Sequence, residues 1–131
     1  MDEVTNKEFT HLKIHTQYSI CEGALRTADL AKFCKINKIK AVGLCDSNNL
    51  CGALEFSESI AKSKTQPIIG TQINIQYKGN MGKIPLFAKD LEGYKNLIKL
   101  SSKSFLAIKD DEEPHCKIED IETNYKGLIL L

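Results

Sequence analysis

Short apolar runs alternate with segments of helical periodicity along most of this sequence. Residues 41–45 form a nearly unbroken apolar run, which is typical of a strand covered on both faces. Residues 67–70 open another strand, which continues through residues 72–77 with alternating polar and apolar side chains. Pro85 indicates that the strand around it lies at a sheet edge or begins late. The remaining strands are expected over residues 9–14, 84–88 and 127–131.

Between these strands, apolar side chains recur at helical spacing. Thr27 can cap a first helix that ends near residues 37–38, and a second helix is expected over residues 52–62. Asp90 can cap a third helix, and residues 118–122 can form one further helical turn. Strands that alternate with helices predict an α/β fold with a largely parallel sheet.

Parallel α/β folds carry their chemistry at the carboxyl ends of the strands. The segments that follow Ile14, Cys45 and Ile69 are therefore the candidates for a functional site. The sequence also stops inside the apolar strand 127–131. Because a complete domain rarely ends on an uncovered apolar run, we expect residues 1–131 to be one partial domain that continues beyond Leu131.

Composition narrows the class of protein only slightly. With 42% hydrophobic and 27% charged residues, the 131-residue chain has ordinary globular usage. Its formal net charge of +1 gives no strong attraction to nucleic acid or membrane, so a role on DNA would depend on other parts that carry the charge. The 5 cysteines form no CxxC pair, which favours free thiols in a reducing cytoplasm over a zinc site. No apolar run approaches the roughly 20 residues that span a bilayer.

Three strand-end segments carry a resemblance to a known family. They read HLKIHTQYS at residues 11–19, CDSNNL at 45–50 and PIIGTQ at 67–72, and further matches follow at 52–56, 92–97 and 122–130. In this order they resemble the PHP (polymerase and histidinol phosphatase) domain, in particular the N-terminal PHP domain of bacterial replicative DNA polymerase III alpha subunits. The resemblance implies the N-terminal part of a distorted β/α barrel of the TIM-like kind.

Active PHP domains hold several divalent metals with His, Asp and Glu side chains at the barrel mouth, and the metals activate water for phosphoester cleavage. The family's first His-x-His falls here on Lys13 and His15, and an acidic position is kept as Glu22. The resemblance places Ser47 where a histidine is usual and Gln72 where a glutamate is usual. With these ligands missing, we expect no metal, no cofactor and no catalytic residue in this chain, with Lys13 paired to Glu22 or Asp46.

The other polar residues near the strand ends have structural interpretations. His11 is expected to form hydrogen bonds inside the barrel mouth, and His15 to be a hydrogen-bonded remnant rather than a ligand. Asp46 and Asn49 are expected to fix the turn into the second helix through bonds to the backbone. His115 is expected to be solvated in an acidic surface loop. Cys45 and Cys51 are interpreted as packing residues rather than a redox pair.

The resemblance implies a function for the whole protein and for this part of it. The parent chain would be a DNA-directed DNA polymerase that uses magnesium, while this PHP domain would be catalytically silent. It would support the polymerase core and dock the proofreading exonuclease subunit, meeting DNA only through the parent chain, in the cytoplasm and away from membranes. An active metal-dependent phosphoesterase or exonuclease of the PHP superfamily is the alternative, and an unrelated α/β binding module is a further one.

Overall fold

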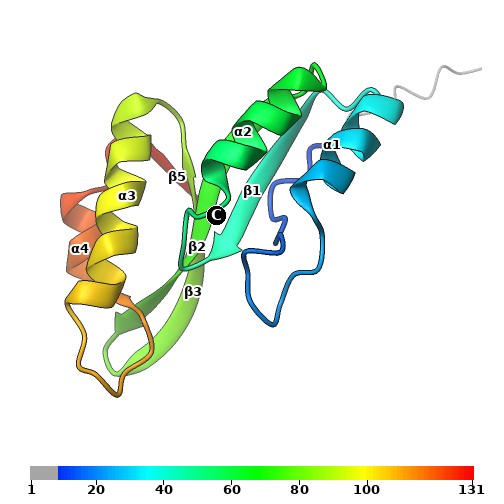
Figure 1. Cartoon of the computed structure of the whole chain (residues 1–131). Coiled ribbons are helices and arrows are strands. Elements are labelled where there is room, and N and C mark those ends of the chain that lie inside the picture. Colours follow the sequence, from blue (N-terminus) through cyan, green and yellow to red (C-terminus); the bar gives the residue numbers. More distant parts are fainter. Residues whose placement is uncertain (1–8) are drawn as a thin grey trace, which may run out of the picture.

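A computed structural model of the chain describes residues 9–131 (Figure 1). Its elements are α1 (Thr27–Ile36), β1 (Ala41–Ser47), α2 (Ala53–Lys62), β2 (Gln66–Tyr77), β3 (Asn80–Ala88), α3 (Leu91–Leu106), β4 (Cys116–Lys117), α4 (Ile118–Thr123) and β5 (Leu128–Leu130). The predicted helices are all present, and so are the predicted strands after the first. No helix in residues 9–131 is long and apolar enough to cross a membrane.

The sheet is mixed, and the prediction of a largely parallel sheet was wrong. Its strand order is β1-β2-β3-β5, with β4 also paired to β2. β1 and β2 are parallel, but β3 is antiparallel to both β2 and β5. β2 and β3 are joined by Lys78 and Gly79, whose φ angles of 48° and 80° suit a two-residue hairpin turn. A crossover to a parallel strand needs a dozen or more residues, so this short link requires an antiparallel pair.

Pro85 lies inside β3, which begins earlier than predicted, at Asn80. β3 pairs with β5 from Leu86 onward, so it is not an edge strand there. The carbonyl oxygen of Pro85 accepts the N–H of Leu131 (3.1 Å), and the ring nitrogen faces the same side. The missing N–H of the proline therefore weakens only the very end of the β5 ladder.

The segment predicted as the first strand runs beside β1 without forming a regular ladder. Gly43 donates its N–H to His11 O (2.7 Å), and Cys45 donates to Ile14 O (2.8 Å). The acceptors are three residues apart while the donors are two apart, so the segment carries one extra residue, as in a bulge. A Cβ at Gly43 would lie 2.5 Å from the carbonyl oxygen of Leu12, which explains why the chain can approach β1 only over a glycine.

α1 starts at Thr27, but Thr27 is not its cap. Arg26 takes the cap position with extended backbone, and the buried Thr27 hydroxyl has no hydrogen-bond partner among the described residues. Because Thr27 is already the first helical residue, its hydroxyl does not reach the N–H groups that a cap serves. The cap of α3 is as predicted, with the Asp90 carboxylate accepting the N–H of Gly93 (2.8 Å).

One face of the sheet carries the helices and the apolar core (Figure 1). Val42 and Leu44 of β1 pack with α1 and α2 in one buried cluster. Ile73 of β2 and Leu86 of β3 pack with α3 and α4 in a second cluster, and Leu50 touches both. Because side chains alternate along a strand, the residues next to these point to the opposite face of the sheet.

One expectation about exposure was wrong, the one for His115. The apolar strand at residues 127–131 is partly exposed, with Ile129 48% exposed and Leu130 44% exposed. In the described part of the chain β5 is the last strand in the sheet order, with β3 as its neighbour. His115 was expected to be solvated, yet it is buried, because its N–H bonds to Ser104 O (3.0 Å) and draws the loop onto α3.

Candidate functional site

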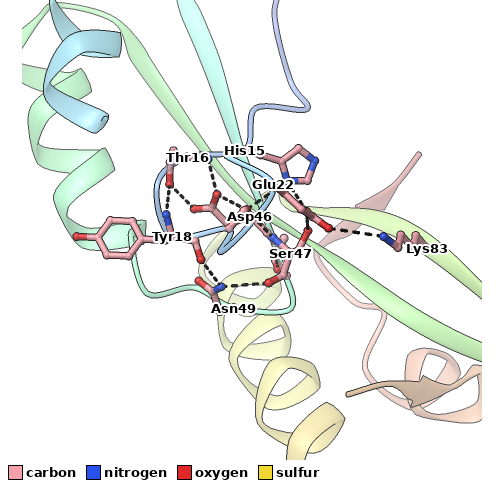
Figure 2. A network of polar contacts seen from close by, with 10 residues as sticks. His15, Thr16, Tyr18, Glu22, Asp46, Ser47, Asn49 and Lys83 are labelled. Atoms are coloured by element: carbon pink, nitrogen blue, oxygen red, sulfur yellow. Dashed lines mark hydrogen bonds and ion pairs between the residues drawn. The ribbon is translucent and has the colours of Figure 1, made fainter. Parts of the chain in front are cut away.

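The carboxylate of Asp46 is fully buried at the carboxyl end of β1 and accepts three hydrogen bonds (Figure 2). Its Oδ1 accepts from the N–H of Thr16 (2.6 Å) and from Ser19 Oγ (2.7 Å), and its Oδ2 accepts from Thr16 Oγ1 (2.7 Å). Asp46 therefore fastens the loop that precedes α1 to the end of β1. The prediction that Asp46 fixes the turn into α2 was wrong, because both of its oxygens are taken by this loop.

Ser19 connects the loop to two further groups. Its hydroxyl donates to Asp46, accepts the N–H of Ser47 (3.0 Å) and lies 3.3 Å from His15 Nδ1. Since the serine hydrogen goes to Asp46, a hydrogen bond between Ser19 and His15 requires Nδ1 to carry the ring hydrogen. His15 is thus hydrogen-bonded and half-buried in this geometry.

Glu22 is the charged centre of the site, and it is surrounded by donors (Figure 2). Ser47 Oγ donates to its Oε2, Lys83 Nζ lies 3.7 Å from its Oε1, and His15 Nδ1 lies 3.7 Å from its Oε2. The bond from the Ser47 hydroxyl, aided by the positive charge of Lys83, lowers the pKa of Glu22. The carboxylate is therefore ionised and already compensated at neutral pH.

Gln72 lies on the same face of the sheet as this cluster. Ser47 of β1 is opposite Gln72 of β2, and Asn74 of β2 is opposite Lys83 of β3. Directly opposed residues point to one face, and so do residues two apart on a strand, so all four side chains share that face. Gln72 is 5% exposed, and its Oε1 has no hydrogen-bond partner among the described residues.

Lys13 and His11 do not form the contacts that the sequence predicted. Among residues 9–131, Lys13 forms no ion pair with Glu22 or Asp46, and Lys83 is the cation beside Glu22. His11 is exposed, stacks edge-on against Phe9 with 4.7 Å between ring centroids, and lines an apolar cavity beside α1. The extra residue in this segment breaks the alternation, so His11 lies with Ile14 on the side of α1, whereas the ammonium group of Lys13 lies near the thiol of Cys45.

Asn49 has the predicted role. Its Nδ2 donates to Tyr18 O (3.0 Å) and Ser47 O (3.1 Å), and its Oδ1 accepts the N–H of Cys51 (3.1 Å). The side chain thus fixes the turn between β1 and α2 and ties it to the preceding loop. Cys45 is buried and Cys51 is exposed, and both thiols are free.

The donors at this site do not suit a cluster of divalent metals. No three His, Cys, Asp or Glu side chains within residues 9–131 are grouped so that they could hold a metal ion. His15 lies beside Glu22, and both are side chains of types that such metals prefer. The ammonium group of Lys83, however, lies near Oε1 of Glu22. Ser47 contributes a hydroxyl and Gln72 a neutral amide.

Several residues of the site were missed by sequence reasoning. Thr16 and Ser19 stand in the polar stretch after His15, so their place at the strand end was a usable signal. Lys83 carries no such signal, because it lies 61 positions from Glu22 in a strand that was predicted to begin after it. Its position depends on the β2–β3 register alone.

Comparison with known proteins identifies the family. The model of the PHP domain family matches residues 11–131. The chain therefore belongs to the PHP domain family. It is 42% identical over 127 residues to the DNA polymerase III subunit alpha of Rickettsia prowazekii, which covers 95% of this chain and 11% of that protein. It is 40% identical over 109 residues to the subunit of the same name from Helicobacter pylori, covering 77% of this chain and 9% of that protein.

Solved structures agree with this family at the level of the fold. A candidate metal-dependent phosphoesterase from Bifidobacterium adolescentis matches with a TM-score of 0.55 at 16% identity, over 72% of this chain and 32% of that one. An amidohydrolase from Chromobacterium violaceum matches with a TM-score of 0.55 at 15% identity, over 72% and 34%. The fold is thus that of the N-terminal part of a PHP barrel, and the chain spans about a tenth of the curated relatives.

Proposed function

We propose that this chain is the N-terminal PHP part of a bacterial DNA polymerase III alpha subunit. The support is its identity of 40–42% to subunits of that name across 77–95% of its length. In this proposal the whole protein elongates DNA in chromosomal replication in the cytoplasm. Magnesium and the polymerase residues belong to the remainder of that longer chain.

We further propose that the site around Glu22 is catalytically silent, and one observation carries this proposal. The Glu22 carboxylate is bonded by Ser47 and faces Lys83 at 3.7 Å, so protein groups already compensate its charge. A metal ion would have to displace these groups and then find its other ligands among neutral or cationic side chains. At the positions where active members carry ligands, this sequence has Lys13, Ser47 and Gln72.

With no reaction of its own, the domain serves as a scaffold. It supports the polymerase core and docks the separate proofreading exonuclease subunit, and it meets DNA as part of the larger chain. The support for this role is membership of the family together with the loss of expected ligands. The buried bonds of Asp46 fit the role, because they hold the strand end rigid without any metal.

The silent site is tested by phosphodiesterase assays and calorimetric metal titration on the 131-residue chain, which lacks the polymerase residues of the longer protein. With manganese or zinc added, we expect no turnover of a chromogenic phosphodiester and no saturable binding heat. The matched control restores the family ligands through Lys13→His, Ser47→His and Gln72→Glu, and it should gain measurable metal binding. Turnover by the unaltered chain that a chelator abolishes would instead support an active phosphoesterase.

The scaffold role needs its own experiment. The complete alpha subunit, carrying the unaltered domain, should retain its proofreading exonuclease on a size-exclusion column. A complete subunit with the triple substitution should retain it equally, because the mouth is not the docking surface in this proposal. Failure of the unaltered subunit to retain the exonuclease would count against the scaffold role and leave the silent site unaffected.

A further inference from the structure

A cluster of lysines lies at the end of the domain opposite Asp46. The C-terminal ends of α1 and α2 and the start of β1 line a cavity of about 530 Å³, and these helix ends lie together at the upper right of Figure 1. β1 separates the cavity from Asp46 by roughly 20 Å, since a strand rises about 3.3 Å per residue. None of the described residues that line it is acidic, and 5 of the 7 are lysines, here called the lysine rim: Lys35, Lys38, Lys40, Lys62 and Lys64.

Stabilisation of the helices does not account for this much positive charge. Within residues 9–131, no ion pair involves Lys35, Lys38, Lys62 or Lys64. Each helix C-terminus carries a dipole charge of about −0.5, so the two ends offset about one of these four positive charges. About three charges therefore remain at one small surface of a chain whose net charge is +1.

The backbone conformation at two of these lysines is a second sign that the positive charge has a function. Lys38 follows the cap of α1 with a φ of 51°, and Lys64 follows the cap of α2 with a φ of 61°. Helices usually place glycine at this left-handed position, because other residues are strained there. The chain thus holds a lysine at both equivalent positions despite the strain, and both side chains join one rim.

We propose that the lysine rim binds the phosphate backbone of duplex DNA. Lysine presents a compact charge without a fixed hydrogen-bonding plane, which suits contacts to phosphate that carry no sequence information. No aromatic ring lines the described cavity, so it lacks the stacking surface that single-stranded sites use. The choice of DNA among polyanions rests on the proposed function, whereas the clustered charge does not.

Binding is measured by fluorescence anisotropy of a short labelled duplex with the full 131-residue chain. Four lysine–phosphate contacts predict a slope of about −4 for the logarithm of affinity against the logarithm of salt concentration. Affinity should then fall about 200-fold between about 50 and 200 mM salt. A slope near zero, or equal binding to a single strand of the same length, would overturn the proposal.

The test variant replaces Lys35, Lys38, Lys62 and Lys64 with glutamine. Its matched control replaces four exposed lysines on other surfaces, and both variants change the net charge from +1 to −3. We expect the test variant to bind at least about tenfold more weakly than the control at low salt. Equal weakening of the two variants would reduce the effect to net charge and refute a localised site. The control positions are Lys89, Lys95, Lys99 and Lys126.

A second variant, Lys38→Gly with Lys64→Gly, separates binding from folding. Glycine relieves the left-handed strain, so the melting temperature should stay unchanged or rise. The slope of affinity against salt should nevertheless become shallower, from about −4 to about −2, because two phosphate contacts are lost. An unchanged slope would contradict the proposal. If polyglutamate competes as strongly as DNA does, the DNA proposal is overturned in favour of an acidic protein partner. The salt-slope and competition results are both independent of the metal test at Glu22.

Discussion

Replacing Asp46 with alanine removes an acceptor that three donors share, and we expect it to lower the free energy of unfolding by about 4 kcal/mol. The N–H of Thr16 has no exposed surface and cannot turn to another acceptor, so leaving it unpaired costs about 1–3 kcal/mol. The hydroxyls of Thr16 and Ser19 can rotate, and each loses about 1 kcal/mol of net bonding. The loss is a large part of the roughly 5–15 kcal/mol that stabilises a typical domain.

The assay is urea unfolding followed by far-ultraviolet circular dichroism. Asp46→Asn keeps one oxygen, and its new amide N–H can donate to Thr16 Oγ1, so this variant should lose only about 1–2 kcal/mol. The matched control is Asp110→Ala in an exposed loop, which should change stability by less than about 0.5 kcal/mol.

A double-mutant cycle separates the hydroxyl from the backbone bond. In a Thr16→Val background, Asp46→Ala should cost about 1 kcal/mol less than in the unaltered chain, because one of the three bonds is already gone. The reasoning is refuted if Asp46→Ala alone lowers stability by less than about 1 kcal/mol, since the loop would then be held by other contacts.

Three further predictions concern other parts of the domain. A methyl group at Gly93 would clash with the carbonyl oxygen of Gly127, so Gly93→Ala should lose about 3 kcal/mol in the same urea assay, whereas Gly82→Ala, with open space around it, should be nearly neutral. Burial opposes ionisation of Asp120, but the bonds from Lys103 and a backbone N–H outweigh burial and lower the pKa of Asp120. The ionised carboxylate therefore stabilises the fold at neutral pH, and this stabilisation is lost as acid protonates the carboxyl below about pH 4. Asp120→Asn should therefore lose about 0.5 kcal/mol at neutral pH and flatten the acid limb of stability against pH, and an unchanged limb would contradict the assignment. At about pH 8 the exposed thiols should react quickly with Ellman's reagent and the buried ones only on unfolding, and rapid reaction of all five would be evidence against the packing. The exposed thiols are Cys21 and Cys51, and the buried ones are Cys34, Cys45 and Cys116, with burial raising the pKa of Cys45 and of Cys116 to about 11.

Local sequence signals predicted most of the elements. The run at residues 41–45 became the buried strand β1, and Asp90 caps α3 as its position indicated. Asn49 fixes the turn into α2 because its amide needs only neighbours within a few residues and the adjacent loop. Such features depend on periodicity and short-range bonds, which the order of residues alone determines.

Errors occurred where a distant segment decided the outcome. His115 stands in an acidic stretch that looks solvated, but a backbone bond to Ser104 of α3 buries it. The segment before Ile14 alternates like a strand, but one extra residue against β1 breaks its ladder and moves His11 away from the mouth. Neither contact can be predicted from the pattern of residues nearby in the sequence.

By itself the sequence determined the α/β class and the family resemblance, and it predicted the loss of expected ligands at Lys13, Ser47 and Gln72, because these depend on residue types in a fixed order. Only the tertiary structure decided that Lys83, and not Lys13, stands against Glu22, since the two-residue hairpin sets the register that carries Lys83 to that face. It also decided that lysines from two helix ends meet at one rim, although the chain as a whole is nearly neutral. Charge and chemistry at a site depend on which side chains converge, and convergence depends on register and packing between segments far apart in the chain.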